Sequence, residues 1–156
     1  MACVVLGVAG CGGEPAGSTN EDGVRRYTLS GVIGATQGVD LDTGSIVDVT
    51  WSDIGSSDIY MTLKMSMMLH GLVDNAFCHK GDGFATVADI PAAADDCEWK
   101  YLSVSGNSPD ATRGVEADGY LFLDGDDDRI HRLLLVDHSI DAEGVGRVTF
   151  DMLAVD

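Results

Sequence analysis

The densest group of side chains capable of chemistry is the acidic run DGDDD at residues 124–128. It places Asp124, Asp126 and Asp128 at alternating positions, and hard carboxylate oxygens are the ligands that Ca²⁺ takes. An EF-hand loop starting at Asp124 would need Gly at its sixth position and Glu at its twelfth, where the chain has Arg129 and Leu135. The run therefore predicts either a Ca²⁺ site of another kind or a solvated hairpin turn, since Asp and Gly also favour turns.

A second acidic turn, VDLDTGS at residues 39–45, contains Asp40 and Asp42. Its Asp42-Thr43-Gly44 sequence resembles the active-site turn of aspartic proteases, in which two such turns meet and their carboxylates share a proton. One copy per chain implies a homodimer of single-lobe chains. Asp40 departs from the apolar residues that this family has before its Asp, and the family's second signature is missing. An ordinary turn is the favoured interpretation, and a single-lobe aspartic protease-like enzyme is the further alternative.

The histidines and cysteines form no familiar catalytic motif. His70, Asp74 and His79 are close in sequence, but their spacing fits no zinc helix motif. Cys78 beside His79 has the residue types of a nucleophile and its base. The sequence has no GxSxG elbow and no phosphate-binding glycine loop. These observations favour a protein without a catalytic role.

Four aromatic residues on predicted strands offer a possible glycan platform. Aromatic rings can stack on sugars, and they also pack into cores and along sheet edges, which is the more frequent use. The four residues are Trp51, Tyr60, Trp99 and Tyr101.

The elements that must position these side chains are predicted from hydrophobic periodicity. In residues 58–70 (DIYMTLKMSMMLH) every odd position is apolar, and the even positions are polar or amphipathic except for Met68. Side chains alternate between faces along a strand, so this pattern predicts one long central β-strand with a buried and a wet face. A helix is the alternative, because Met and Leu are good helix formers.

The rest of the body has shorter strand patterns separated by turn residues. Residues 34–45 and 55–57 are predicted to be turns, 85–90 a short strand and 92–96 a helical turn. The other predicted strands are residues 26–33, 46–54, 98–104, 115–123, 129–136 and 144–155. Seven or eight short strands predict an all-β fold, an antiparallel two-sheet β-sandwich or a partly open barrel.

Composition restricts the class of partner. The chain has 156 residues, 45% of them hydrophobic, which suits a single domain with a real core. Acidic residues number 26 and basic residues 9, for a net charge of −17. Because such a surface repels polyanions, nucleic-acid binding is not expected. An acidic coat is typical of soluble surfaces outside the cytoplasm, and it also attracts cations.

The N-terminus carries an export-type pattern. Residues 2–9 are apolar or small, and a glycine-rich polar stretch follows Cys11. Val8-Ala9-Gly10-Cys11 resembles the lipobox of bacterial lipoprotein precursors, although no Lys or Arg precedes the apolar stretch. The resemblance implies cleavage before Cys11, acylation of Cys11 and a stable membrane anchor. Gly12 in place of Asp after that cysteine favours the outer membrane. A buried N-terminal strand at residues 3–8 is the alternative.

This resemblance sets the expected organisation of the chain. Residues 1–10 would be the remnant of a signal peptide, 11–24 an acylated flexible tether and 25–156 the β-sandwich domain. After lipidation, the remaining cysteines Cys78 and Cys97 would most simply pair as a disulfide, with two buried thiols as the alternative. The predicted protein is thus a lipid-anchored, non-catalytic structural or binding module of the cell envelope, whose candidate partners are another envelope protein and a glycan. The alternative is a variant of that module that binds Ca²⁺ or a glycan.

Overall fold

The computed structural model describes residues 19–20, 22–50, 52, 55, 57–63, 67–71, 75–100, 104–107 and 118–156. The predicted lipobox at residues 8–11, with the lipidation site Cys11, lies outside these residues. So do Trp51, Asp74 and Tyr101.

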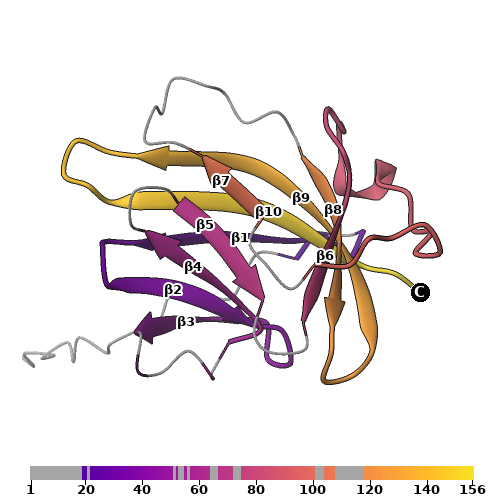
Figure 1. Ribbon diagram of the computed structural model, residues 1–156, viewed down its shortest axis with the longest axis horizontal. Coiled ribbons are helices and arrows are strands. Elements are labelled where there is room, and N and C mark those ends of the chain that lie inside the picture. Colours follow the sequence, from indigo (N-terminus) through magenta and orange to yellow (C-terminus); the bar gives the residue numbers. More distant parts are fainter. Residues whose placement is uncertain are drawn as a thin grey trace, which may run out of the picture.

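The described residues form two antiparallel sheets of five strands each (Figure 1). Sheet I has the strand order β1-β10-β9-β8-β6, and sheet II has the order β3-β2-β4-β5-β7. The strands of sheet I are β1 (Arg25–Gly31), β10 (Gly146–Ala154), β9 (Arg129–Ile140), β8 (Gly119–Asp124) and β6 (Ala76–Gly81). The strands of sheet II are β3 (Ser45–Thr50), β2 (Ala35–Asp40), β4 (Ile59–Leu63), β5 (Met67–Gly71) and β7 (Val104–Asn107). Each sheet keeps two edge strands, so the predicted β-sandwich is confirmed and neither sheet closes into a barrel.

The prediction of one long strand at residues 58–70 is wrong, because this stretch contains the two strands of a hairpin. β4 and β5 pair with Met61 opposite Leu69 and Leu63 opposite Met67. This register pairs odd-numbered residues with odd-numbered residues. Alternation by two is therefore the same for this hairpin as for a single strand, and periodicity alone could not separate them. The buried face is as predicted where it is described, since Ile59, Met61 and Leu63 are all buried.

Three further predictions of local structure are wrong, in segments where glycine or a short apolar run makes the hydrophobic periodicity ambiguous. The predicted turn at residues 34–45 contains β2, whose Gly38 approaches Ser57 and Ile59 too closely to admit a side chain. The predicted strand at residues 85–90 contains the 3₁₀ helix η1 (Val87–Asp89) instead. The Asp89 carboxylate accepts hydrogen bonds from the backbone N–H and the hydroxyl of Thr86, which stabilises this helical turn. Residues 92–96 form no helix. β2, β5 and β6 were not predicted as separate strands, so the part of the chain that the structure describes has ten strands rather than seven or eight.

The main core lies between the sheets and is aromatic at its centre. The rings of Phe77 and Phe122 are 5.0 Å apart, and those of Tyr27 and Phe150 are 5.6 Å apart. Aliphatic residues from β4, β9 and β10 surround these rings, and all of them are nearly inaccessible to solvent. Most of the hydrophobic stabilisation of the fold comes from this layer.

A second, smaller core covers the outer face of sheet I. Leu121 and Leu134 pack there against Val87 and Ile90 from the segment 82–99, which lies beside β6 and β8 in Figure 1. Cys78 of β6 is joined to Cys97 of this segment by a disulfide, as predicted, with their Cα atoms 5.5 Å apart. Closing a loop of this size stabilises the fold by about 3 kcal/mol in the chain-entropy model. No helix among the described residues has the length and apolar character that crossing a membrane requires.

Candidate metal centres

Three aspartates from different parts of the chain meet at one end of the sandwich. Asp124 is the last residue of β8, Asp126 lies in the turn between β8 and β9, and Asp58 directly precedes β4. One carboxylate oxygen of each lies within 4.8 Å of the others. We call Asp58, Asp124 and Asp126 the aspartate cluster. Because it joins residues of both sheets, its geometry depends on how the sheets pack.

Buried Asn75 links the two segments that carry the aspartate cluster. Its Nδ2 donates to the backbone oxygen of Asp58 at 3.0 Å, and its Oδ1 accepts from the backbone N–H of Gly125 at 2.7 Å. The Asp58 carboxylate in turn accepts a hydrogen bond from the backbone N–H of Leu41 at 2.7 Å. These bonds hold the three carboxylates together despite their mutual repulsion.

The charges in the aspartate cluster are crowded. Asp124 is only 4% exposed, and burial followed by the charges of Asp58, Asp127 and Asp126 raises its pKa to about 6. Burial also raises the pKa of Asp58, with contributions from the negative charges of Asp40 and Asp42. The two acidic turns noted in the sequence therefore act on the same cluster. A bound cation would relieve this repulsion.

The predicted Ca²⁺ ligands are only partly assembled by the fold. Asp124 and Asp126 belong to the aspartate cluster, whereas Asp128 does not. Asp128 has a φ of 57°, the left-handed conformation that ends the turn before Arg129. The prediction that Asp124, Asp126 and Asp128 lie on one side of an extended backbone therefore fails at Asp128. Asp58 takes its place as the third carboxylate. Nothing in the sequence spacing pointed to Asp58 or Asn75, because both approach residues 124–126 only through packing of the two sheets.

Asp42-Thr43-Gly44 forms the turn between β2 and β3, as the ordinary-turn interpretation predicted. Asp40 accepts a hydrogen bond from the backbone N–H of Thr43 at 3.0 Å, and Gly44 has a φ of 70°. These features are those of a hairpin turn in which Asp and Gly have conformational roles. The Arg25 guanidinium lies so close to Gly44 that a Cβ there would clash with it.

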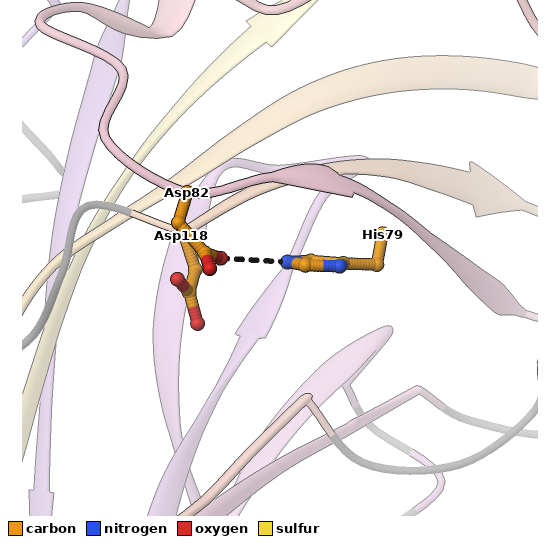
Figure 2. A group of neighbouring side chains, drawn as sticks. All are labelled: His79, Asp82 and Asp118. Atoms are coloured by element: carbon orange, nitrogen blue, oxygen red, sulfur yellow. Dashed lines mark hydrogen bonds and ion pairs between the residues drawn. The ribbon is translucent and has the colours of Figure 1, made fainter.

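A second cluster with a different donor set lies where β6 ends and β8 begins (Figure 2). It consists of His79 in β6, Asp82 in the loop after β6 and Asp118 just before β8, and we call it the His79 cluster. Nε2 of His79 is 3.1 Å from Oδ1 of Asp82, and one ligand atom of each residue lies within 4.8 Å of the others. Figure 2 shows the Asp118 carboxyl group next to that of Asp82, with the His79 ring edge facing them.

The two carboxyl groups of the His79 cluster have opposite pKa shifts. Burial, followed by the hydrogen bond to Asp82 and its charge, raises the pKa of Asp118 to about 6. The same hydrogen bond lowers the pKa of exposed Asp82. The hydroxyl of Tyr120 donates to Asp118 at 3.3 Å, and burial raises the pKa of this phenol. Below about pH 6 the two carboxyl groups therefore share a proton, in the position that a cation could also occupy.

The remaining sequence candidates do not come together. His70 lies in sheet II, where its Nε2 is 2.7 Å from the Thr62 hydroxyl and its ring stacks on Tyr60, whereas His79 lies in sheet I. Cys78 is in the disulfide and is therefore not a free nucleophile for His79 to activate.

Two residues of the predicted glycan platform lie on opposite sides of the molecule. Trp99 packs against the outer core of sheet I. Tyr60 alternates with buried Ile59 and Met61 and so belongs to the outer face of sheet II. They cannot share one sugar-binding surface.

Sheet II also has a shallow depression where β2 and β4 diverge. These strands pair at Gly38–Tyr60 and Val39–Ile59, and the depression lies beyond these two pairs. Its lining consists of Gly34, Thr36, Val49, Thr50, Tyr60, Met61, Thr62 and Leu63. This lining contains hydroxyl and apolar groups and none of the carboxylates or histidines described above.

Comparisons of the chain with protein-family models, with curated proteins and with solved structures give no match.

Proposed function

We propose that this protein is a lipid-anchored β-sandwich of the bacterial cell envelope that acts as a structural or binding module rather than as an enzyme. The observation that carries the proposal is the Cys78–Cys97 disulfide. Disulfides persist outside the reducing cytoplasm, which is where a lipobox delivers a chain. The net charge of −17 fits the same location, because it favours solubility and disfavours contact with nucleic acids.

The anchor is tested by labelling the protein with radioactive palmitate in a bacterial host. We expect label in the wild type and none in Cys11→Ala, with the variant moving from the membrane fraction to the soluble fraction. Cys3→Ala is the matched control and should label like the wild type, because Cys3 belongs to the cleaved segment. Equal labelling of the wild type and Cys11→Ala would contradict the lipid anchor.

Ca²⁺ binding at the aspartate cluster is the second function that we propose. The specific observation in its favour is that Asp124, 4% exposed, faces two further carboxylates within 4.8 Å. Carboxylate oxygens at adjustable spacing suit Ca²⁺, and the environment outside the cell supplies this ion. The backbone oxygens of the adjoining turn and water would complete the six to eight ligands that Ca²⁺ takes.

Thermal melting with Ca²⁺ and with a chelator tests this site. A hundredfold excess of Ca²⁺ over Kd stabilises the folded state by about 2.7 kcal/mol, which corresponds to a rise in Tm of roughly 5–10 °C. Asp126→Asn should remove most of this rise. The neighbouring Asp128→Asn should keep it, because Asp128 is outside the cluster. A Tm that Ca²⁺ does not change in the wild type would exclude the site.

A further inference from the structure

We propose that His79, Asp82 and Asp118 form a second metal site, selective for Zn²⁺ and related transition-metal ions rather than for Ca²⁺. This inference is independent of the anchor and of the Ca²⁺ site. It is based on the donor set, on the way the fold holds these side chains and on their exposure to solvent.

The donor set differs in kind from that of the aspartate cluster. One imidazole nitrogen and one oxygen from each of two carboxylates lie within 4.8 Å of one another. A small contraction of this group would place all three atoms around one Zn²⁺ ion, at the metal–ligand distances of about 2.0–2.2 Å that Zn²⁺ has to N and O. Imidazole suits Zn²⁺, Co²⁺ and Ni²⁺, whereas Ca²⁺ and Mg²⁺ prefer sites made only of oxygen ligands. Three protein ligands leave a fourth tetrahedral position for water or for a group of a bound molecule.

The fold fixes two of the three ligands. His79 is paired with Tyr120 across β6 and β8, and its ring lies against the Tyr120 ring with the centroids 4.9 Å apart. The Tyr120 hydroxyl donates to Asp118, so one tyrosine contacts both the imidazole and a carboxylate. Such contacts orient the ligands of a metal before it binds. The adjacent Cys78–Cys97 disulfide further restrains β6 next to His79.

The local strand geometry and the exposure of the side chains allow an ion to enter. The β6–β8 register shifts between His79 and Gly81, and a β-bulge of this kind changes the direction of neighbouring side chains at a sheet edge. β6 is an edge strand, and both His79 and Asp82 are exposed while Asp118 is half-buried. An ion therefore has direct access from solvent.

Binding of Co²⁺ and Zn²⁺ to the full-length chain tests the proposal. All proteins in the experiment carry Cys3→Ser and Cys11→Ser, so that no thiolate outside the disulfide competes for metal. We expect one equivalent of Co²⁺ to give a visible absorption spectrum with N/O ligands, Zn²⁺ to displace it, and excess Ca²⁺ to leave it in place. Calorimetry with Zn²⁺ measures the affinity.

His79→Ala and Asp118→Asn should each weaken Zn²⁺ binding by at least about a hundredfold, since each removes one ligand of three. Asp126→Asn, which alters only the aspartate cluster, is the matched control and should bind Zn²⁺ like the parent protein. Melting curves in chelator establish that the variants fold. No Co²⁺ spectrum in the parent, or equal Zn²⁺ affinity in parent and His79→Ala, would overturn the proposal. Displacement of Co²⁺ by Ca²⁺ would also overturn it, because the site would then lack the proposed selectivity.

Discussion

At the scale of single residues, the unusual feature is that several carboxyl groups are easier to protonate in the folded chain than in the unfolded one. Asp118 and Asp124 both have a pKa of about 6, in each case chiefly because burial disfavours the anion. The pKa of Asp58 is raised for the same reason. A buried carboxyl group lowers the stability of the folded chain, and carboxyl groups with raised pKa values are frequent at ligand-binding sites.

The raised pKa values predict that stability falls as the pH rises from about 4 to about 6 in chelator. Burial lowers the pKa of His70 and His131, so these two groups alone would make stability rise with pH, chiefly near pH 6. At Asp58, Asp118 and Asp124 the folded protein binds more protons than the unfolded chain, whose aspartates titrate near 3.9, so these three groups make the free energy of unfolding decrease with pH. Asp96 and Asp141 act in the opposite direction, because a Lys80 hydrogen bond and the Val145 N–H, respectively, lower their pKa. Their stabilisation is lost only below about pH 4. Urea denaturation between pH 4 and 7 measures the slope.

Asp124→Asn isolates one contribution to this slope. The variant should have a shallower decrease between pH 4 and 6, and in chelator at pH 7 its Tm should be higher by on the order of 3 °C. Ca²⁺ should no longer stabilise the variant. Compared with the wild type, it should therefore melt at a higher temperature in chelator and show no rise in Tm when Ca²⁺ is added. A variant with the same pH slope as the wild type would contradict the burial of this charge.

At the scale of elements, Asn75 joins segments that lie next to strands of different sheets. It is 2% exposed, and its amide bonds both the segment before β4 and the turn after β8. A covalent connection lies within β6 itself, where the Cys78–Cys97 disulfide joins the strand to the segment that covers sheet I. The short strand β6 is thus restrained just before its first residue and at Cys78, and one candidate metal site lies near each of its ends.

Asn75→Ala should lower the free energy of unfolding by roughly 2–3 kcal/mol, because the N–H of Gly125 and the backbone oxygen of Asp58 lose their partner in a buried place. It should also weaken Ca²⁺ binding, since Asp58 and Asp126 are then free to move apart. Asn20→Ala is the control. The Asn20 side chain likewise makes two hydrogen bonds to the backbone, both accepted by its Oδ1, but it does so on the surface, so its loss should cost about 1 kcal/mol or less. Similar effects of the two substitutions in urea denaturation would refute the role given to Asn75.

At the scale of the whole molecule, the aromatic core between the sheets opposes the repulsion of the acidic coat. Phe122 is fully buried between sheets I and II, and its ring packs against Phe77. Phe122→Ala should destabilise the protein by about 3–5 kcal/mol, through lost burial and the cavity left behind. Ile33→Ala, at a side chain that is 71% exposed, should change stability by no more than about 0.5 kcal/mol. Equal effects in denaturant titrations would contradict the placement of the core.

How far the sequence alone predicts this protein depends on the range of the interactions involved. Alternation over two residues is a local property, so the all-β class, the buried face of residues 59–63 and the turn at 124–128 followed from it. The pairing of Cys78 with Cys97 followed from counting, once the N-terminal cysteines were assigned elsewhere. Whether residues 58–70 form one strand or two did not follow, because the hairpin register preserves the same parity.

The two candidate metal sites required the tertiary structure. Asp58 reaches Asp124 only because the two sheets pack face to face, and Asp118 reaches His79 only because β6 and β8 pair as neighbours. These contacts join residues distant in sequence, and they depend on strand order, which local periodicity does not encode. Composition and motif made Ca²⁺ a hypothesis. The packing of the strands decided which carboxylates face one another, and it replaced Asp128 by Asp58 in the aspartate cluster.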